Sequence, residues 1–204
     1  MSTIATLANC LVTVKRPTAY LLDAVAVAAS HTVDRQPAAA GPVQVDVTGS
    51  PTGTVTVAGT VNGLADTEAL TYSGASAVRT TTKRFSAVSG MTTSLSGGTL
   101  ISAKSVSPGG APQSAYKTVV SDRPAERRVR GMQSFPMLIP GQERKEGAVF
   151  RIQYEDTWQP LQGDVLVVAS DSLEYEVQGK PRAFGDFAPD HWQIQSDLID
   201  ARTA

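Results

Sequence analysis

The C-terminal stretch of the chain, residues 147–200, contains four short runs of apolar side chains separated by turn residues. Three of them alternate apolar and polar positions, and the fourth is an apolar run that follows Gln162-Gly163. Successive side chains of a strand point to opposite faces of a sheet, so this pattern predicts β-strands. The runs are residues 149–154, 164–168, 174–178 and 191–195. Their short spacing between Gly, Pro, Asp and Ser residues indicates a small antiparallel barrel or sandwich.

A further strand is expected near the N-terminus, at residues 11–15, where the sequence Leu-Val-Thr-Val-Lys has strong β propensity. Arg16-Pro17 ends this strand, because proline cannot donate a hydrogen bond to a neighbouring strand. Residues 19–30 have apolar positions that fit either a helix face or a strand, so the pattern leaves both open. Residues 36–42 contain two prolines and a glycine and are expected to form a linker.

The composition changes after this linker, from residue 43 to residue 106, where Thr, Ser, Gly, Val and Ala predominate and charges are few. Short alternating runs recur there, and Asn62-Gly63 supplies a strong hairpin signal because both residues accept a positive φ. Such short, threonine-rich strands favour a small immunoglobulin-like β-sandwich. The stretch lacks the paired cysteines and the core tryptophan of an antibody domain, so the similarity concerns architecture only.

A second set of breakers at residues 107–112 closes this cassette. Strands are predicted on both sides of it, and the N-terminal strand alone is too little to fold. We therefore predict a mainly β protein with a discontinuous antiparallel β-barrel, residues 1–41 and 107–204. The immunoglobulin-like β-sandwich, residues 42–106, would be inserted into that barrel.

Charge and cysteine content narrow the possible classes. The 204 residues carry 18 basic and 19 acidic side chains, so a globally basic nucleic-acid-binding protein is not indicated. Cys10 is the single cysteine, which excludes an intrachain disulfide. The most apolar run, residues 19–29, is too short to cross a bilayer and contains Asp23. No convincing secretory signal opens the chain, so we expect a soluble protein made in a cytoplasm without a membrane partner.

Four arginines lie close together in a polar stretch: Arg123, Arg127, Arg128 and Arg130. Guanidinium groups pair well with phosphate oxygens, so one interpretation is a loop that faces DNA. Another is a solvated loop that Asp122 and Glu126 partly neutralise. A third is an arginine-rich interface between subunits.

Motifs for catalysis or for binding a cofactor are not found. His31 and His191 are the only histidines, and neither has carboxylates and thiolates at metal-ligand spacing. No nucleophile elbow, phosphate-binding glycine loop, EF-hand or zinc-knuckle pattern occurs. We therefore expect no enzyme, no metal and no cofactor. The aromatic residues gather in the last third, and Phe184 and Phe187 before Pro189 are candidates for docking a partner protein.

Several short motifs resemble those of the head-completion or stopper proteins of tailed bacteriophages. They are the first strand, residues 11–16; the run 132–143; Gly-Asp-Val-Leu at 163–166; Glu-Tyr-Glu-Val at 174–177; and His-Trp-Gln-Ile at 191–194. The similarity covers residues 9–17 and 131–200. A minimal stopper lacks the cassette, which resembles the immunoglobulin-like modules that phage virion proteins often carry.

The resemblance implies a ring, expected to be a hexamer, in the virion neck between the portal or adaptor ring and the tail. Such a ring would be assembled in the host cytoplasm, retain packaged DNA and dock tail terminator or tail tube proteins. In this interpretation residues 109–130, with their arginines, form a loop that closes the channel and touches DNA non-specifically. Two alternatives stay open: a tail terminator or other tail protein, and a carbohydrate-binding, adhesin-like module that uses Trp158 and Trp192.

Overall fold

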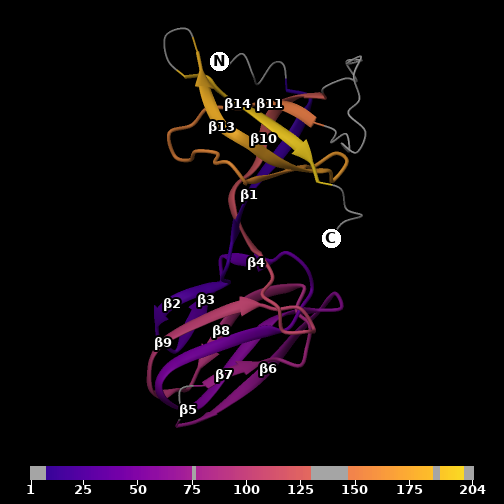
Figure 1. Ribbon diagram of the computed structural model, residues 1–204. Helices are drawn as coiled ribbons and strands as arrows, with labels where there is room; N and C mark the ends of the chain where they lie inside the picture. Colours follow the sequence, from indigo (N-terminus) through magenta and orange to yellow (C-terminus); the bar gives the residue numbers. More distant parts are fainter. Residues whose placement is uncertain (1–7, 75–76, 130–146, 186–188, 200–204) are drawn as a thin grey trace, which may run out of the picture. The chain divides into compact units, whose positions relative to one another are not determined.

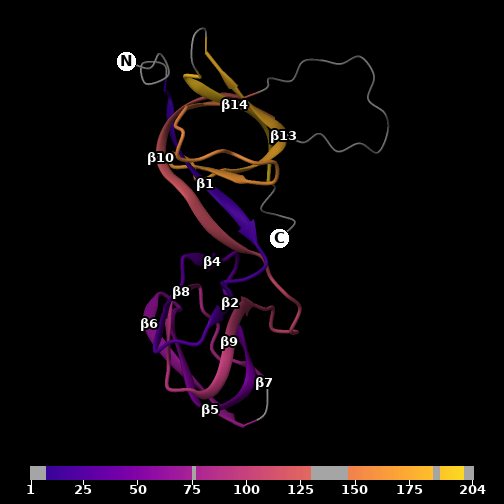
Figure 2. The ribbon, with the colours of Figure 1, turned by 90° about the vertical axis from the view of Figure 1, so that its left-hand side faces the viewer.

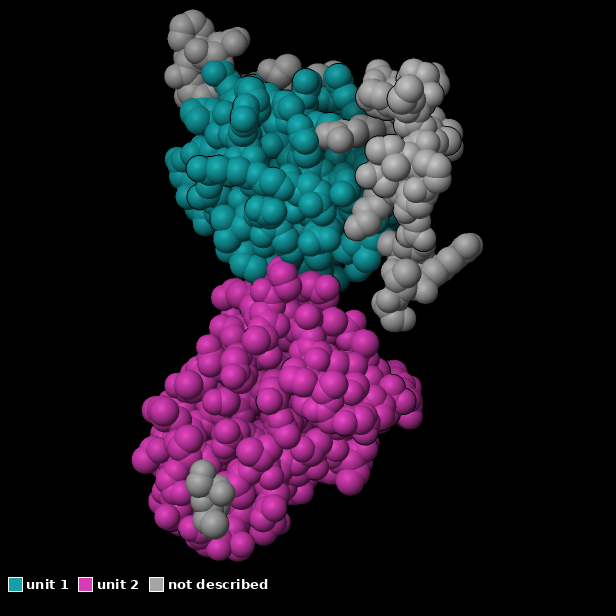
Figure 3. Space-filling view, viewed as in Figure 1, with its two compact units in different colours: residues 1–16, 118–204 teal, residues 17–117 magenta. Residues whose placement is uncertain are grey.

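A computed structural model describes residues 8–74, 77–129, 147–185 and 189–199, and within these ranges the chain forms strands and no helix (Figure 1). The mainly β fold class predicted from the sequence is thereby confirmed. The chain divides into two compact units: Met1–Arg16 with Thr118–Ala204, and Pro17–Lys117 (Figure 3). The first unit is thus discontinuous in sequence, and the second is inserted into it. In the described ranges there is no helix that could cross a membrane.

The first unit is a closed barrel of six strands. They are β1 (Cys10–Thr18), β10 (Ala115–Val129), β11 (Gly147–Gln153), β12 (Val165–Val168), β13 (Glu174–Phe184) and β14 (His191–Leu198). Their order is β1-β12-β13-β14-β11-β10, and β10 pairs with β1 to close the ring of strands (Figure 2). Closure removes the free edges that would otherwise pair with another chain.

The barrel core is formed by apolar side chains at alternate positions of each strand. Val12 and Val14 of β1 are fully buried, and so are Phe150 and Ile152 of β11. Phe150 meets Tyr175 of β13 edge to face, with 5.2 Å between the ring centroids. Each such side chain contributes about 1.5–3 kcal/mol when it is removed from water. The four strands predicted in the C-terminal stretch are therefore all present, and their apolar positions face one core.

An ion pair ties β1 to the entrance of β12. Asp164, 1% exposed, accepts hydrogen bonds from Nε and Nη2 of Arg16 at 2.9 and 3.0 Å. The backbone N–H of Leu161 donates to the same carboxylate at 2.8 Å. Gly163 takes a φ of 85°, a conformation that favours glycine, and so turns the chain toward Asp164. The Gly-Asp motif found in the sequence thus holds together two segments that are 148 residues apart.

The second unit is one curled sheet of seven strands. They are β2 (Leu22–Ala26), β3 (Ser30–Thr32), β5 (Val43–Val61), β6 (Leu64–Ser73), β7 (Ala77–Thr80), β8 (Ala87–Thr93) and β9 (Ser96–Ser105). A short strand, β4 (Arg35–Pro37), pairs with the start of β10.

The long strand β5 serves both halves of this sheet. Its first part pairs with β9 and β7, and its second part pairs with β6 and β8. The strand bends between Gly49 and Gly53, which have φ values of 95° and 127°. Valines from both parts of β5 are fully buried in one core with Tyr72 and Met91. A single strand that bends in this way replaces the two separate sheets of the expected immunoglobulin-like sandwich.

The structure confirms the predicted hairpin turn and decides the conformation of one ambiguous segment. Asn62 and Gly63 have φ values of 52° and 82° and join β5 to β6, as the hairpin signal predicts. The ambiguous residues 19–30 contain the strand β2.

The inserted unit extends from Pro17 to Lys117, beyond the 42–106 expected from composition. The prolines and glycines expected to form linkers lie inside this unit, where Pro37 ends β4 and Gly41 forms a β-bridge with Phe85. Gly41 exchanges two backbone hydrogen bonds with Phe85, and the N–H of Gln113 donates to Ser105. Breakers therefore mark bends within the unit and do not mark its ends.

Candidate functional site

The described arginines of the cluster lie on strand β10, where a loop from residue 109 to residue 130 was expected. Arg123 and Arg127 share one face of the strand with the fully buried Ala125, because side chains two residues apart point the same way. Polar side chains on this inward face remove the apolar alternation that would have predicted a strand. Arg130 lies outside the described residues.

Carboxylates at opposite ends of the barrel pair with these two arginines. Arg123 forms a two-point contact with Glu155, which follows β11, at 2.6 and 2.7 Å. Arg127 contacts Asp171, in the turn after β12, at 2.6 Å, and this hydrogen bond raises the pKa of Arg127. Burial raises the pKa of Asp171, but the hydrogen bonds from Arg127 and from the N–H of Leu173, together with the charge of Arg127, lower it on balance.

The third arginine is paired on the outer side of β10. Arg128 contacts Glu126 at 2.6 Å, and Arg151 of β11 approaches the same carboxylate at 3.4 Å. All three described members of the cluster therefore have acidic partners. The arrangement matches a partly neutralised surface, and contact with DNA phosphates would require these pairs to open.

The aromatic residues divide into a buried and an exposed group. Trp158 and Trp192 are 8% and 7% exposed, and Trp192 packs against Tyr154 with 5.0 Å between ring centroids. They belong to the barrel core, so these two side chains are not exposed as the adhesin-like alternative expects. Phe184 is 41% exposed and stacks on His191 at 5.8 Å. Phe187 lies outside the described residues.

Candidate catalytic and metal-binding groups are sparse in the described ranges. His191 contacts the neighbouring Asp190 through Nδ1. No group of three His, Cys, Asp or Glu side chains in these ranges could hold a metal ion. The Cys10 thiol is half-buried, donates to the backbone oxygen of Ala125 at 3.3 Å, and has its pKa raised mainly by burial.

A hollow of about 320 Å³ lies on the outer face of β13 and β14. Arg182 faces Gln193 across the two strands, and Gln178 faces Gln195. Between Gln178 and Arg182 the register shifts at a bulge, where Gly179 has a φ of 68° and Lys180 is exposed. The hollow is lined by two cations, three amides, Gly179 and Phe184: Gln178, Gly179, Lys180, Arg182, Phe184, Gln193 and Gln195.

Sequence reasoning did not single out Lys180 and Arg182. In the described ranges neither forms an ion pair with a carboxylate. The signal that could have indicated them is the sequence Gly179-Lys180-Pro181-Arg182 inside a strand, because glycine and proline there predict a bulge that redirects side chains. Among the described residues of the barrel, the cations without an acidic partner are thus on β13.

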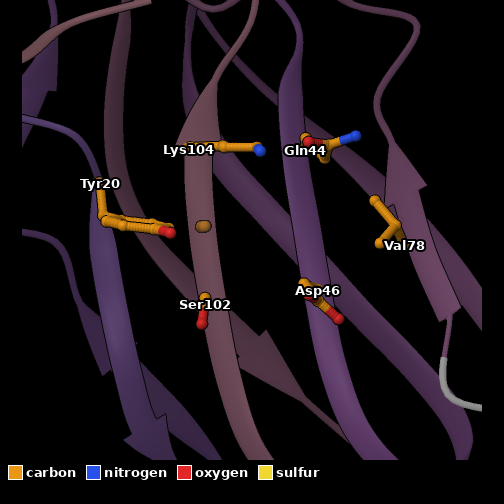
Figure 4. Close-up of a pocket in the computed structure, with 7 residues that line it drawn as sticks. Tyr20, Gln44, Asp46, Val78, Ser102 and Lys104 are labelled. Atoms are coloured by element: carbon orange, nitrogen blue, oxygen red, sulfur yellow. The ribbon is translucent and has the colours of Figure 1, made fainter. Parts of the chain in front are cut away.

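The inserted unit has a smaller hollow of about 110 Å³ on the outer face of β5, β7 and β9. Figure 4 shows Gln44, Asp46, Ser102 and Lys104 projecting from paired strands, with Tyr20 beside them. Its volume is well below the few hundred cubic ångströms typical of ligand pockets, and it assigns no ligand.

No protein-family model, no curated protein and no solved structure matches this chain.

Proposed function

We propose that this protein is a structural subunit of the neck of a tailed bacteriophage, forming a ring between the portal or adaptor and the tail. The observation that supports the proposal is the assembly of four of the five stopper-like motifs; the fifth, the run 132–143, lies outside the described residues. Residues 11–16, 163–166, 174–177 and 191–194 lie on or at the start of β1, β12, β13 and β14, which are consecutive neighbours in the barrel. Segments far apart in sequence therefore belong to one structural element.

The physical character of the barrel suits this role. A closed barrel has no free strand edge, so it associates through side-chain faces and loops and avoids open-ended strand pairing. Ring closure lets several modest contacts act together, because each subunit is held on two sides. The proposed role is to retain packaged DNA and to dock the tail, and it needs neither a catalytic step nor a cofactor.

A null mutation in the phage that encodes the protein tests this proposal. We expect tailless heads that package DNA but do not retain it, together with free, complete tails. Complementation with the wild-type gene should restore tailed particles. Normal tailed particles in the null mutant would overturn the proposal.

The tail terminator is the second candidate within the same class, and the same experiment separates it. Loss of a terminator should give tails of irregular length, whereas loss of a neck ring leaves tail length unchanged. Mass spectrometry of purified virions should find a copy number that fits one ring, whereas a tail tube subunit would be present in many rings.

A further inference from the structure

The side chains on the outer face of the β13–β14 hairpin change in charge from one end of the hairpin to the other. One end is acidic, the middle carries amide side chains, and the other end is basic and aromatic. In order along β13 the outward positions are Glu174, Glu176, Gln178, Lys180, Arg182 and Phe184, and along β14 they are Asp197, Gln195, Gln193 and His191.

The acidic end contains a pair of like charges. Glu176 of β13 lies directly opposite Asp197 of β14 in the strand register. Like charges in directly opposite positions destabilise a pair of strands. In the described ranges neither carboxylate forms an ion pair, and Lys15 contacts only the adjacent Glu174, at 3.9 Å. A cation supplied by another molecule would relieve this repulsion.

The basic end contains the complementary groups. Lys180 and Arg182 are exposed and have no acidic partner in the described ranges, and the hollow of about 320 Å³ lies between them and the amides. An exposed apolar side chain accompanies each end of the hairpin: Phe184, 41% exposed, at the basic end and Leu173, 39% exposed, before the acidic end. Apolar side chains beside charged groups are common at protein–protein contacts.

We propose that this face binds a second copy of the chain, with the basic end of one copy against the acidic end of the next. The inference rests on the proposed ring and names the surface that would build it. Because of the bulge, the acidic and basic ends are best measured along β14, where Asp197 and Gln193 are four residues apart, or roughly 13 Å at 3.3 Å per residue. A ring requires the basic end of one copy to meet the acidic end of one neighbour and its acidic end to meet the basic end of another; both ends meeting the same copy would give a twofold dimer.

A nucleic acid is the competing occupant, since cations beside an aromatic ring also suit a single strand. Two observations disfavour it. Glu176 and Asp197 on the same face would repel phosphates, and Lys180 and Arg182 alone would neutralise only two of them. Electrostatic affinity for nucleic acid grows with the number of phosphates neutralised, so two contacts give weak binding. Charge complementarity within the face therefore favours a second copy.

Charge reversal in the full-length chain tests the inference. One variant carries Lys180→Glu and Arg182→Glu, and a second carries Glu176→Lys and Asp197→Lys. Sedimentation velocity over a range of protein concentrations measures association. We expect the wild type to form oligomers and each variant alone to require about a hundredfold higher concentration, because like charges then meet at the contact. An equimolar mixture of the two variants should associate again, since opposite charges are restored between unlike copies.

A matched control variant reverses two cations of the inserted unit, Arg84→Glu and Lys104→Glu, and should associate as the wild type does. Circular dichroism checks that every variant is folded. A wild type that stays monomeric at all concentrations, or charge-reversed variants that associate normally, would overturn the inference.

Binding to a fluorescent single-stranded oligonucleotide identifies the competing occupant. If the wild type binds it and Lys180→Glu with Arg182→Glu abolishes binding, while self-association is unchanged, the face binds nucleic acid and the inference is wrong. These outcomes are independent of the phage null mutant, whose phenotype alone decides whether the protein acts in the neck.

Discussion

The ion pair between Arg16 and Asp164 gives the most direct test of how the interrupted barrel is held together. Arg16 belongs to the strand before the insertion, and Asp164 belongs to the segment after it. Asp164→Ala removes three accepted hydrogen bonds: two from the Arg16 guanidinium and one from the N–H of Leu161. We expect this substitution to destabilise the barrel without changing its fold.

The magnitude follows from burial and from what each partner keeps. Breaking a buried pair costs about 3–5 kcal/mol, because the remaining group is left without a partner. The Arg16 side chain is 33% exposed and still donates to the backbone oxygen of Gln159 at 2.8 Å, so water can solvate it. The lower limit therefore applies, and Asp164→Ala should cost about 3 kcal/mol. For a unit of this size the midpoint of thermal unfolding should fall by roughly 10–20 °C.

Tryptophan fluorescence isolates the barrel in this measurement. The chain has two tryptophans, Trp158 and Trp192, and both belong to the barrel, so urea unfolding followed by fluorescence does not report on the inserted unit. The single variants Arg16→Ala and Asp164→Ala and the double variant form a thermodynamic cycle. We expect a coupling energy of about 2 kcal/mol, since two charge-assisted hydrogen bonds are lost only once.

Asp164→Asn is the matched variant, because it keeps the size of the side chain and removes the charge. We expect Asp164→Asn to lower the free energy of unfolding relative to the wild type, but by less than Asp164→Ala does. A coupling energy near zero would refute the reasoning, since Arg16 and Asp164 would then be neighbours without a shared role. Equal costs for Asn and Ala would show that the negative charge accounts for the whole effect and that the size and remaining hydrogen bonding of the side chain contribute nothing.

Three further predictions concern other parts of the molecule. Burial raises the pKa of the Cys10 thiol, so at neutral pH it should react with a disulfide reagent more slowly in the folded than in the urea-unfolded protein; equal rates would contradict its burial. Burial also raises the pKa of Tyr72 to about 12 from 10.0, so its contribution to stability is complete below pH 10 and is lost as the pH rises to about 12. Ultraviolet absorbance should therefore show a late-titrating tyrosine that Tyr72→Phe removes, and the loss of a tyrosine that titrates near 10 in that variant would refute this. Replacing residues 17–117 by a short glycine-serine linker should leave a folded barrel with buried tryptophans, because β1 and β10 are neighbours; a chain without cooperative unfolding would show that the barrel needs its insertion.

The strands of the C-terminal stretch could be predicted from sequence because their buried positions are large and apolar. Phe150 and Ile152 are two positions apart in β11, Ile194 lies in a similar alternating run in β14, and all three are buried in the barrel core. Strand β10 could not be recognised in the same way. Its inward face carries Arg123 and Arg127, whose charges are neutralised by carboxylates that are remote in sequence.

The candidate surface was harder to predict from the sequence than the fold. A cluster of arginines is conspicuous in a sequence, whereas the pairing of each arginine with an acid is visible only in three dimensions. Conversely, Glu176 and Asp197 are 21 positions apart and become a like-charge pair only through the register of β13 and β14. Composition reports how many charges there are, and strand register decides which of them are left without a partner.

The point where the inserted unit joins the barrel has a consequence for how the chain folds. Thr18 and Ala115 lie near the two ends of this unit, and the Thr18 hydroxyl donates to the backbone oxygen of Ala115 at 3.3 Å. If residues 17–117 were unstructured, bringing β1 to β10 would cost about 4 kcal/mol in loop-closure entropy. A unit that folds first and holds its own ends together removes most of this cost and turns a long-range pairing into a local one. The insertion would then set the rate at which the barrel closes, and mutations deep inside it would slow barrel folding without touching any barrel residue.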